Sequence, residues 1–363
     1  MDKKDEIILQ QLEVIRTMTE RNLRSMGDDF WGTPFEGVLS PKSPSAPPSD
    51  GKPVGSADGK MPAQPSDGKT AGGQPAAKAE KTEVVEPLPK EDMKDLQAEL
   101  DSYIGLATVK EEVRNLINMA SVYKLRRQHD LPTTDMSLHM VFTGNPGTGK
   151  TMMARMMARI YRSLDILSKG QLVEVDRSGL VAGYVGQTAI KTQKVIQKAI
   201  GGVLFIDEAY ALNGKSENDF GQEAIDTILK AMEDHRDDLV VIVAGYTDLM
   251  DKFIHSNPGL ESRFNRFLLF EDYTPDEMLD IFKMQCKKGC YQLSDGVEEL
   301  VRDYITEENG DPETFGNARG VRNIFEHILV AQNNRLAAME TVTKEDLMTL
   351  TQDDVLHARG KLD

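Results

Sequence analysis

The sequence feature that most constrains this chain is the octapeptide Gly144–Thr151, which reads Gly-Asn-Pro-Gly-Thr-Gly-Lys-Thr. It matches the P-loop pattern G-x-x-x-x-G-K-[ST], and it stands between an apolar stretch of strand length and a helical segment rich in Met, Ala and Arg. Glycines allow the backbone N–H groups of such a loop to turn toward phosphate oxygens, and the start of the following helix adds the positive end of its dipole. A glycine-rich turn without a ligand is the alternative, and this context disfavours it.

Two residues of this loop and two carboxylates further along the chain predict the chemistry of the site. Lys150 would reach the β- and γ-phosphates of a bound ATP, and the Thr151 hydroxyl would bind Mg²⁺. The apolar strand Val203–Ile206 is followed directly by Asp207 and Glu208. Ligands of open α/β sheets bind at the carboxyl ends of the strands. Asp207 is therefore placed to hold the Mg²⁺ shell, and Glu208 to orient and polarise the attacking water.

Apolar runs of strand length alternate with helical patterns from about Glu91 onward, which predicts a parallel sheet with helices on both faces. The expected strands are Leu138–Thr143, Leu172–Val175, Val203–Ile206, Leu239–Ala244 and Phe267–Phe270. The expected helices between them are Thr151–Leu164, Thr188–Ala199, Gln222–Asp234 and Asp248–Ser256. Thr274, Pro275 and the acids after them form a helix start, and helical patterns follow. The expected fold class is α/β: a P-loop core with a parallel five-stranded sheet flanked by helices, followed by a small all-helical domain.

The chain is expected to divide into four parts. Residues 1–28 hold an amphipathic helix, because their apolar residues recur with helical spacing. Residues 29–90 form a disordered linker rich in Pro, Gly and Ser, which buries too little apolar surface to fold. Phe30-Trp31 in this linker is either a docking motif or a local apolar cluster. The remaining parts are an α/β nucleotide-binding domain, residues 91–272, and a helical domain, residues 273–363.

The charge balance bears on partners and location. Lys and Arg number 43 and Asp and Glu number 59, which gives a net charge of −16. This balance disfavours nucleic acid as a partner, because phosphate backbones bind surfaces with an excess of Lys and Arg. Cys286 and Cys290 are accompanied by no second Cys pair or His cluster, so we expect free thiols and no zinc site. A charged start and the lack of an apolar run of about 20 residues predict a cytoplasmic protein without a membrane span.

Several further segments resemble those of AAA+ ATPases, and within them the group of stage V sporulation protein K and the red-type Rubisco activase CbbX. The resemblance extends from about Leu96 to Val355. Its segments are Leu100–Leu106, Gly183–Thr188, Asp207–Tyr210, Ala244–Asp248, Ser256–Gly259 and Gly316–Arg319. The resemblance implies an Mg²⁺-dependent ATPase that hydrolyses ATP to ADP and phosphate, with the helical domain as its lid.

The resemblance also implies roles for individual residues. The residues expected to bind the nucleotide are Ile104, Gly105, Asn145, Pro146, Gly147, Thr148, Gly149, Lys150, Thr151, Met152 and Arg319. The expected metal ligands are Thr151 and Asp207. The residues expected to take part in hydrolysis are Glu208, Lys150, Arg263 and Arg319.

Two of these residues are arginines whose roles depend on the resemblance. Arg263 resembles the arginine finger, which reaches the γ-phosphate of the neighbouring subunit; a guanidinium suits this role because it is always charged and donates in a fixed fork. Arg266 is either a second such residue or a surface arginine. Arg319 resembles the sensor-2 arginine that joins the lid to bound ATP, and Arg322, one turn later, is the alternative.

The chain departs from the family at the end of the fourth strand. Many AAA+ proteins carry Asn there to help position the attacking water. Here the aligned residue is Tyr246, and Asp248 follows shortly after it. The identity of this sensor-1 residue therefore stays open between the two.

Tyr184 stands where the family places the aromatic residue of the central-pore loop, between Gly183 and Gly186, which cannot help to bury it. The resemblance implies a homo-oligomeric ring, most often a hexamer, that pulls on a protein client through this loop. One alternative is a nucleic-acid motor or loader on the same fold, which the acidic balance and the loop's lack of Lys and Arg disfavour. Another is a nucleotide-gated scaffold with little turnover, which Glu208 and Arg263 disfavour.

Overall fold

The structure is a computed structural model that describes residues 86–133, 137–184, 186–214 and 220–360. The predicted N-terminal helix in residues 1–28, the Phe30-Trp31 segment and nearly all of the predicted linker lie outside these ranges. Within the described ranges, no helix is long and apolar enough to cross a membrane.

A five-stranded parallel sheet, in the order β2-β3-β4-β1-β5, forms the centre of the first domain. Its strands are β1 (Met140–Gly144), β2 (Leu172–Val175), β3 (Val203–Ile206), β4 (Val240–Gly245) and β5 (Phe267–Phe270). Every residue of β1, β3 and β4 is buried, which explains why their sequences are apolar except for Thr143 and the terminal glycines, since helices cover both faces of the sheet. The order brings the carboxyl ends of β1 and β3 to one edge, with only β4 between them.

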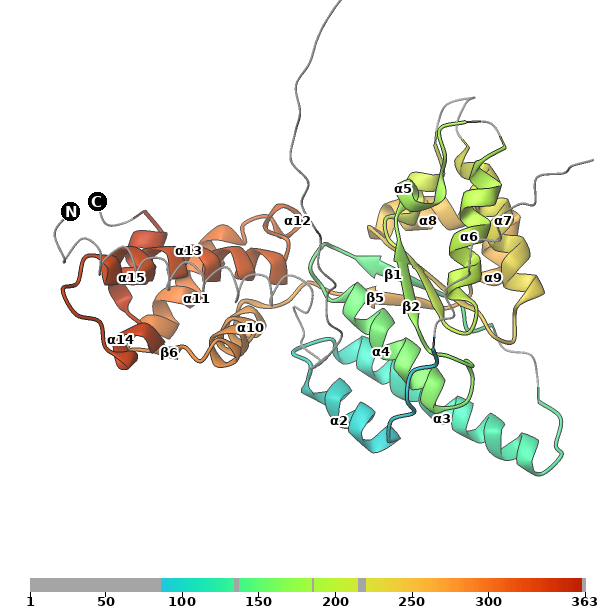
Figure 1. The fold of residues 1–363 in the computed structure, drawn as a ribbon, viewed down its shortest axis with the longest axis horizontal. Helices are drawn as coiled ribbons and strands as arrows, with labels where there is room; N and C mark the ends of the chain where they lie inside the picture. The colour runs from blue at the N-terminus through green and yellow to red at the C-terminus, as the bar shows by residue number, and fades with distance from the viewer. Residues whose placement is uncertain (1–85, 134–136, 185, 215–219, 361–363) are drawn as a thin grey trace, which may run out of the picture. The chain divides into compact units, whose positions relative to one another are not determined.

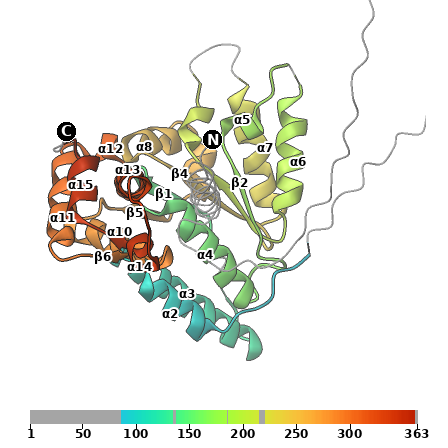
Figure 2. The ribbon, with the colours of Figure 1, turned by 60° about the vertical axis from the view of Figure 1, so that its left-hand side comes forward.

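Helices cover the two faces of this sheet. On one side lie α2 (Met93–Ser102), α3 (Ala107–Gln128) and α4 (Lys150–Ser163) (Figure 1). The other side carries α5 (Arg177–Leu180), α6 (Thr188–Ala199), α7 (Gly221–Asp234), α8 (Thr247–His255) and α9 (Pro258–Arg263), with the short 3₁₀ helix η1 (Ala209–Leu212) (Figure 2). The apolar core on this second side joins Val141, Leu204 and Val241 of the sheet to residues of α6, α7 and α8.

The predicted strands are confirmed, three of them with identical bounds, and the remaining two differ at their ends. β1 begins at Met140, two residues later than predicted. The preceding His139 is buried, and its Nδ1 accepts a hydrogen bond from the N–H of Val241 at 3.0 Å. The His139 side chain thus accepts from the Val241 N–H, which would bond to a backbone carbonyl of β1 if that strand began earlier. This explains why β1 begins at Met140.

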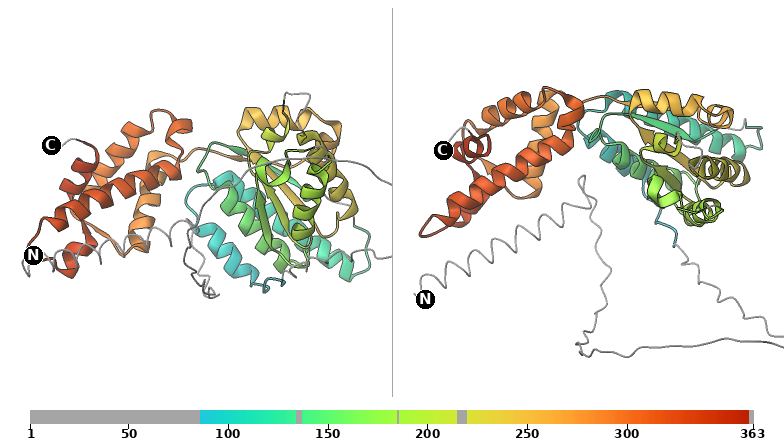
Figure 3. Two further views of the ribbon diagram at one scale, coloured as in Figure 1. Left: turned by 45° about the horizontal axis from the view of Figure 1, so that its top comes forward. Right: turned by 90° about the horizontal axis from the view of Figure 1, so that it is seen from above.

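The second domain consists of helices with a small addition that the sequence patterns did not predict. The helices are α10 (Pro275–Lys288), α11 (Val297–Glu308), α12 (Pro312–Phe315), α13 (Ala318–Ala337), α14 (Lys344–Met348) and α15 (Gln352–Ala358), coloured orange to red in Figure 3. α10 begins as predicted, with Thr274 and Glu277 forming a capping box. The addition is a two-stranded parallel sheet of β6 (Gln292–Leu293) and β7 (Thr349–Leu350), whose strands are too short to show a periodicity.

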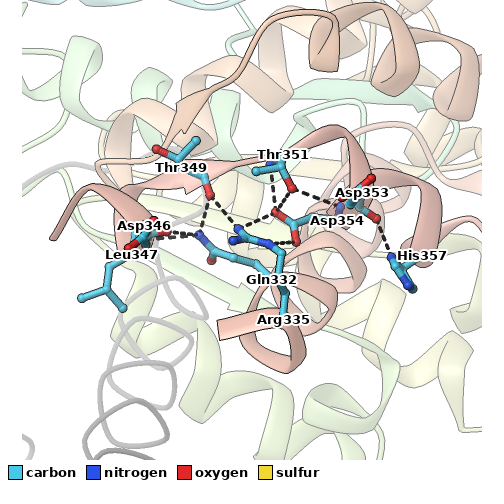
Figure 4. A network of polar contacts seen from close by, with 9 residues as sticks. All are labelled: Gln332, Arg335, Asp346, Leu347, Thr349, Thr351, Asp353, Asp354 and His357. Atoms are coloured by element: carbon cyan, nitrogen blue, oxygen red, sulfur yellow. Dashed lines mark hydrogen bonds and ion pairs between the residues drawn. The ribbon is translucent and has the colours of Figure 1, made fainter. Parts of the chain in front are cut away.

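A polar network fixes the C-terminal α15 on α13 (Figure 4). Arg335 of α13 donates two hydrogen bonds to Asp354, from Nε at 2.8 Å and from Nη2 at 2.9 Å. The Nε2 of Gln332 donates to the backbone carbonyl of Thr349 at 2.9 Å. Asp354 is only 1% exposed and also accepts from Thr351, at the start of α15. The ion pair therefore compensates a buried carboxylate.

We predict that Arg335→Met destabilises the helical domain by about 3–5 kcal/mol, because it leaves the Asp354 charge buried without its partner. The double variant Arg335→Met/Asp354→Asn should recover part of this loss, since the amide is neutral. Arg302→Met is the matched control, because it breaks an exposed ion pair. The side chains of Arg302 and Asp276 are 51% and 71% exposed, and breaking their pair should cost no more than about 1 kcal/mol. Urea unfolding of the four proteins measures the difference. Equal losses in Arg335→Met and Arg302→Met would contradict the prediction.

Candidate nucleotide-binding and hydrolysis site

The loop between β1 and α4 has the backbone conformation of a phosphate-binding loop. Gly147 and Gly149 have φ angles of 72° and 94°, in the left-handed region where residues with a Cβ are strained. Gly149 is also the N-cap of α4, directly before Lys150, so the N-terminus of that helix opens onto the loop. Thr148 is fully buried, and its hydroxyl donates to the carbonyl of Asn145 at 2.8 Å, which closes the loop.

The ammonium of Lys150 lies over this loop. Its Nζ donates to the carbonyls of Gly144 at 2.9 Å and Asn145 at 2.8 Å. Burial lowers the pKa of Lys150 to about 8, and the Asp207 carboxylate is the largest of the charges that oppose this shift. The structure thus brings the predicted lysine and the predicted carboxylate into one electrostatic neighbourhood.

The two acids after β3 take different positions. The N–H of Asp207 donates to the carbonyl of Val175 at 2.9 Å, so the sheet continues one bond beyond the strand. Glu208 has a φ of 48°, a left-handed conformation that is uncommon for a residue with a Cβ, and its N–H donates to Asp207 Oδ1 at 3.0 Å. Asp207 is half-buried, whereas Glu208 is exposed.

These groups fit a nucleoside triphosphate with Mg²⁺. The P-loop has two glycines in the left-handed conformation, the N-terminus of α4 and the Lys150 ammonium, all of which suit the binding of phosphate oxygens. Thr151 and Asp207 supply hard oxygen donors, and Mg²⁺ is commonly held by one or two carboxylates together with substrate phosphates. In the described ranges, no group of three or more His, Cys, Asp or Glu side chains could hold a metal ion.

Three residues of this neighbourhood were missed by the sequence analysis: Asp272, Tyr273 and Asn317. The Nδ2 of Asn145 lies 3.1 Å and 2.9 Å from the two carboxylate oxygens of Asp272. Asn317 Nδ2 donates to the same carboxylate at 2.8 Å. Asp272 and Tyr273 lie two and three residues after the end of β5, and this position at the carboxyl edge of the sheet is the signal that could have found them.

The predicted adenine-side segment lies beside Tyr273. A Cβ on Gly105 would come within 3.0 Å of the Tyr273 ring, and one on Gly149 would come within 3.3 Å of Met152 and 3.5 Å of the Tyr273 hydroxyl. That hydroxyl donates to the carbonyl of Thr148 at 3.3 Å, and burial raises the pKa of Tyr273. Gly105, Met152 and Tyr273 thus surround the same end of the P-loop.

Of the two sensor-1 candidates, Tyr246 lies in an aromatic pair. It follows β4 directly, and its ring centroid is 6.2 Å from that of Tyr210. Burial, followed by the Glu208 charge, raises the pKa of Tyr210 to about 12. Asp248 is exposed in the first turn of α8. The pair therefore links the end of β4 to the turn that carries Glu208.

The structure separates the predicted arginines. Arg319, exposed at the start of α13, lies close enough to Lys150 for its charge to help lower that lysine's pKa. Arg322 is ion-paired with Glu326 at 2.8 Å. Arg266 donates from Nε to the carbonyl of Ser137 at 3.1 Å, which is a structural contact. Arg319 is thus the arginine of α13 that the fold brings to the P-loop.

Arg263 lies at the end of α9. Its guanidinium makes long contacts: 3.4 Å to the Gly259 carbonyl and 3.4 Å to Glu233. Its Nε is buried without a hydrogen-bond partner. In the described part of the chain, Arg263 makes no hydrogen bond or ion pair with the P-loop of its own subunit.

Tyr184 is 74% exposed, and a Cβ on its neighbour Gly183 would meet nothing within 4 Å. Gly186 has a φ of 74°. Val185 between them lies outside the described residues. The aromatic ring is therefore not part of the protein core.

Comparison with known proteins assigns this architecture to a family. Residues 140–272 match the "ATPase family associated with various cellular activities (AAA)", and residues 274–362 match the AAA lid domain. A ribulose bisphosphate carboxylase/oxygenase activase of Cyanidioschyzon merolae is 45% identical over 273 residues, which are 74% of this chain and 92% of that protein. The chain belongs to the AAA ATPase family. It is an ATPase, and ATP hydrolysis is its reaction.

Other AAA relatives place the chain in the predicted group. Stage V sporulation protein K of Bacillus subtilis is 40% identical over 72% of this chain and 82% of its own length. Protein CbxX of Cupriavidus necator is 42% identical over 76% of this chain and 88% of its own length. The crystal structure of the FIGL-1 AAA domain is similar in fold, with a TM-score of 0.51 at 18% identity, covering 72% of this chain and 82% of that one.

Acid should destabilise the segment around Arg263 through His139. Burial, with a smaller contribution from the Arg263 charge, lowers the pKa of His139 to about 4, whereas an unfolded histidine titrates near 6.5. The unfolded chain therefore binds the extra proton between these values, and stability present above pH 6.5 is lost as the pH falls toward 4.

We predict that His139→Asn, which keeps an acceptor for the Val241 N–H, removes a pH-dependent loss on the order of 2–3 kcal/mol between about pH 6.5 and pH 4. Urea unfolding of wild type and variant across this range measures the difference between their pH profiles. Parallel profiles would show that His139 does not titrate in this way.

Proposed function

We propose that this ATPase remodels a protein client as a homo-oligomeric ring, with six subunits, by means of the loop that carries Tyr184. The observation that carries the proposal is that Tyr184 is 74% exposed, and that its neighbours Gly183 and Gly186 have no side chains to pack against its ring. An exposed aromatic ring can hold many polypeptide sequences by apolar contact and hydrogen bonding. The name of one relative, an activase of ribulose bisphosphate carboxylase/oxygenase, fits action on another protein. We also propose that the chain has the four parts expected from the sequence, residues 1–28, 29–90, 91–272 and 273–363, and that the protein is cytoplasmic.

The roles proposed for the site follow from its chemistry. Backbone N–H groups of the P-loop and Lys150 bind the phosphates, while Thr151 and Asp207 hold Mg²⁺, which would neutralise the charge that develops on the phosphates. The Glu208 carboxylate, exposed on its left-handed turn, orients and polarises the attacking water. Arg319 senses the nucleotide from the lid. Tyr246 takes the sensor-1 position, in its pair with Tyr210.

The site is proposed to be shared between subunits. Within its own subunit the guanidinium of Arg263 makes only long contacts, of 3.4 Å to the Gly259 carbonyl and 3.4 Å to Glu233, and we propose that it exchanges them for the γ-phosphate of a neighbour. A nucleic-acid motor is the alternative on this fold, but the net charge of −16 and an apolar, aromatic loop favour a polypeptide. A scaffold without turnover would not need Glu208 beside Asp207.

We predict that Arg263→Ala binds ATP nearly normally but loses most of its ATP hydrolysis, on the order of a hundredfold or more, because the guanidinium acts on another subunit's nucleotide. Arg302→Met on the second domain is the matched control and should keep full activity. Wild-type activity per subunit should also rise with protein concentration as rings assemble. If activity per subunit stayed constant down to a demonstrably monomeric concentration, the shared site would be refuted.

We predict that Tyr184→Ala retains basal ATPase activity and assembly but loses client remodelling and any client-stimulated increase in ATPase rate. Tyr184→Phe keeps the ring and should retain most of the activity. Ile190→Ala, at another exposed apolar residue on α6, tests whether any loss of apolar surface has this effect. Clients can be captured on the ATP-trapping Glu208→Gln variant, or a loosely folded polypeptide with an unfolding reporter can be used. Full remodelling by Tyr184→Ala would show that force is not delivered through this loop.

A further inference from the structure

Asn317 occupies an unusual position between the P-loop and the lid. It is fully buried, in the turn that precedes α13. Its side chain makes three hydrogen bonds outside the lid helices. Nδ2 donates to Asp272 at 2.8 Å and to the carbonyl of Pro146 at 3.3 Å, and Oδ1 accepts from the N–H of Tyr273 at 2.9 Å. One amide therefore contacts the P-loop and two of the residues that lead from β5 into the lid, Asp272 and Tyr273.

The backbone around Asn317 lies directly against the same loop. The N–H of Ala318 donates to the carbonyl of Gly147 at 3.3 Å. A Cβ on Gly147 would come within 2.1 Å of the carbonyl oxygen of Gly316, a distance that only glycine permits. The P-loop and the start of α13 are thus in contact without any side chain between them.

Asp272 extends this contact to a second residue of the P-loop. Its carboxylate accepts from the amide of Asn145, at 3.1 Å and 2.9 Å, and from that of Asn317. Asn145 and Pro146 are consecutive, so two adjacent loop residues are both held by the Asp272–Asn317 pair. Any rearrangement of the loop around a phosphate would change the geometry of these bonds.

The backbone of Asn317 indicates that its side chain is needed here. Its φ of 53° and ψ of −123° are in a region that residues with a Cβ rarely adopt. Glycine would adopt this conformation without strain but could make none of the three side-chain bonds. Strain of this kind persists where surrounding contacts hold it, often at functional sites.

We propose that Asn317 is a positioning residue that couples the P-loop to the lid: phosphate occupancy of the loop is transmitted to α13 through Asn145, Asp272 and Asn317. This path is distinct from direct binding of the nucleotide by Arg319. It depends on nucleotide binding at the P-loop and not on the ring, the pore loop or the client. The side chain of Asn317 acts through the loop and does not touch the reacting atoms.

Asn317→Gly is the decisive variant, because it relieves the strained backbone and removes only the side-chain bonds. We expect its thermal unfolding without nucleotide to stay close to that of wild type. Its preference between ATPγS and ADP, measured by calorimetry, should change by about five- to tenfold, in the range typical of coupling between sites. Amide hydrogen exchange of residues 316–321 should slow on nucleotide binding in wild type and much less in the variant.

Two further variants make the result specific. Thr314→Ala removes a hydrogen bond to Asp311 in the neighbouring α12, which does not reach the P-loop, and should behave as wild type. Asn145→Ser keeps the loop backbone but removes the link to Asp272, and should reproduce the Asn317→Gly effect on exchange in the lid. If Asn317→Gly does not fold, the exchange measured in Asn145→Ser tests the coupling between the P-loop and the lid.

Wild-type nucleotide preference together with wild-type exchange protection in a folded Asn317→Gly protein would overturn the proposal and leave Asn317 a purely structural residue. If the wild-type protein bound neither ATPγS nor ADP, the assignment of the P-loop as the nucleotide site would itself be refuted. The two failures are therefore distinguishable.

Discussion

The structure depends on how the backbone carbonyls of the P-loop are satisfied. A phosphate-binding loop must direct its N–H groups to the ligand, so its carbonyls point elsewhere and need donors, because unpaired buried carbonyls are costly. Here every carbonyl from Gly144 to Gly149 has one. The donors are Lys150 Nζ for residues 144 and 145, Asn317 Nδ2 for 146, the Ala318 N–H for 147, the Tyr273 hydroxyl for 148 and the Met153 N–H for 149. Three of the six carbonyls are thus paired by residues that follow the last strand of the sheet, and the lid completes the loop.

This dependence explains what the sequence could predict and what it could not. The P-loop is visible because a single strand–loop–helix unit fixes the spacing of its residues. The acids after β3 are visible because they directly follow an apolar run, at the edge of the sheet where ligands bind. The bounds of β2, β3 and β5 were predictable because each is a short run, apolar except for Glu174 of β2, that is followed directly by an acidic residue. The bonds of Asp272, Tyr273 and Asn317 to Asn145, Thr148 and Pro146 span more than a hundred residues of sequence, so no local spacing predicts these contacts.

The choice between Arg319 and Arg322 shows the same limit on a smaller scale. The two lie one turn apart on α13, and sequence spacing cannot separate them. What separates them is the turn before the helix, where Gly316 and Asn317 both have positive φ and set Ala318 against Gly147. With the first turn of α13 fixed in this way, Arg319 lies by Lys150, while Arg322 pairs with Glu326. A backbone conformation therefore determines which of the two arginines lies near the P-loop.

The arginines also differ in how fully their hydrogen-bonding groups are used, and this difference bears on the proposed ring. Arg159 of α4 is bound by Glu91 and Glu99, with 2.8 Å bonds from Nε to Glu91 and from both Nη atoms to Glu99, so it has a complete structural role within one subunit. Arg263 is comparably shielded, yet its Nε has no partner and its other contacts are 3.4 Å or longer. A guanidinium carries five donors in a rigid fork, and leaving them unpaired in a partly buried position is costly. The buried Nε is out of reach of an acceptor from outside the subunit, but the side chain as a whole is 30% exposed. In the proposed ring, the γ-phosphate of a neighbouring subunit's ATP would be an acceptor for the other donors of the fork.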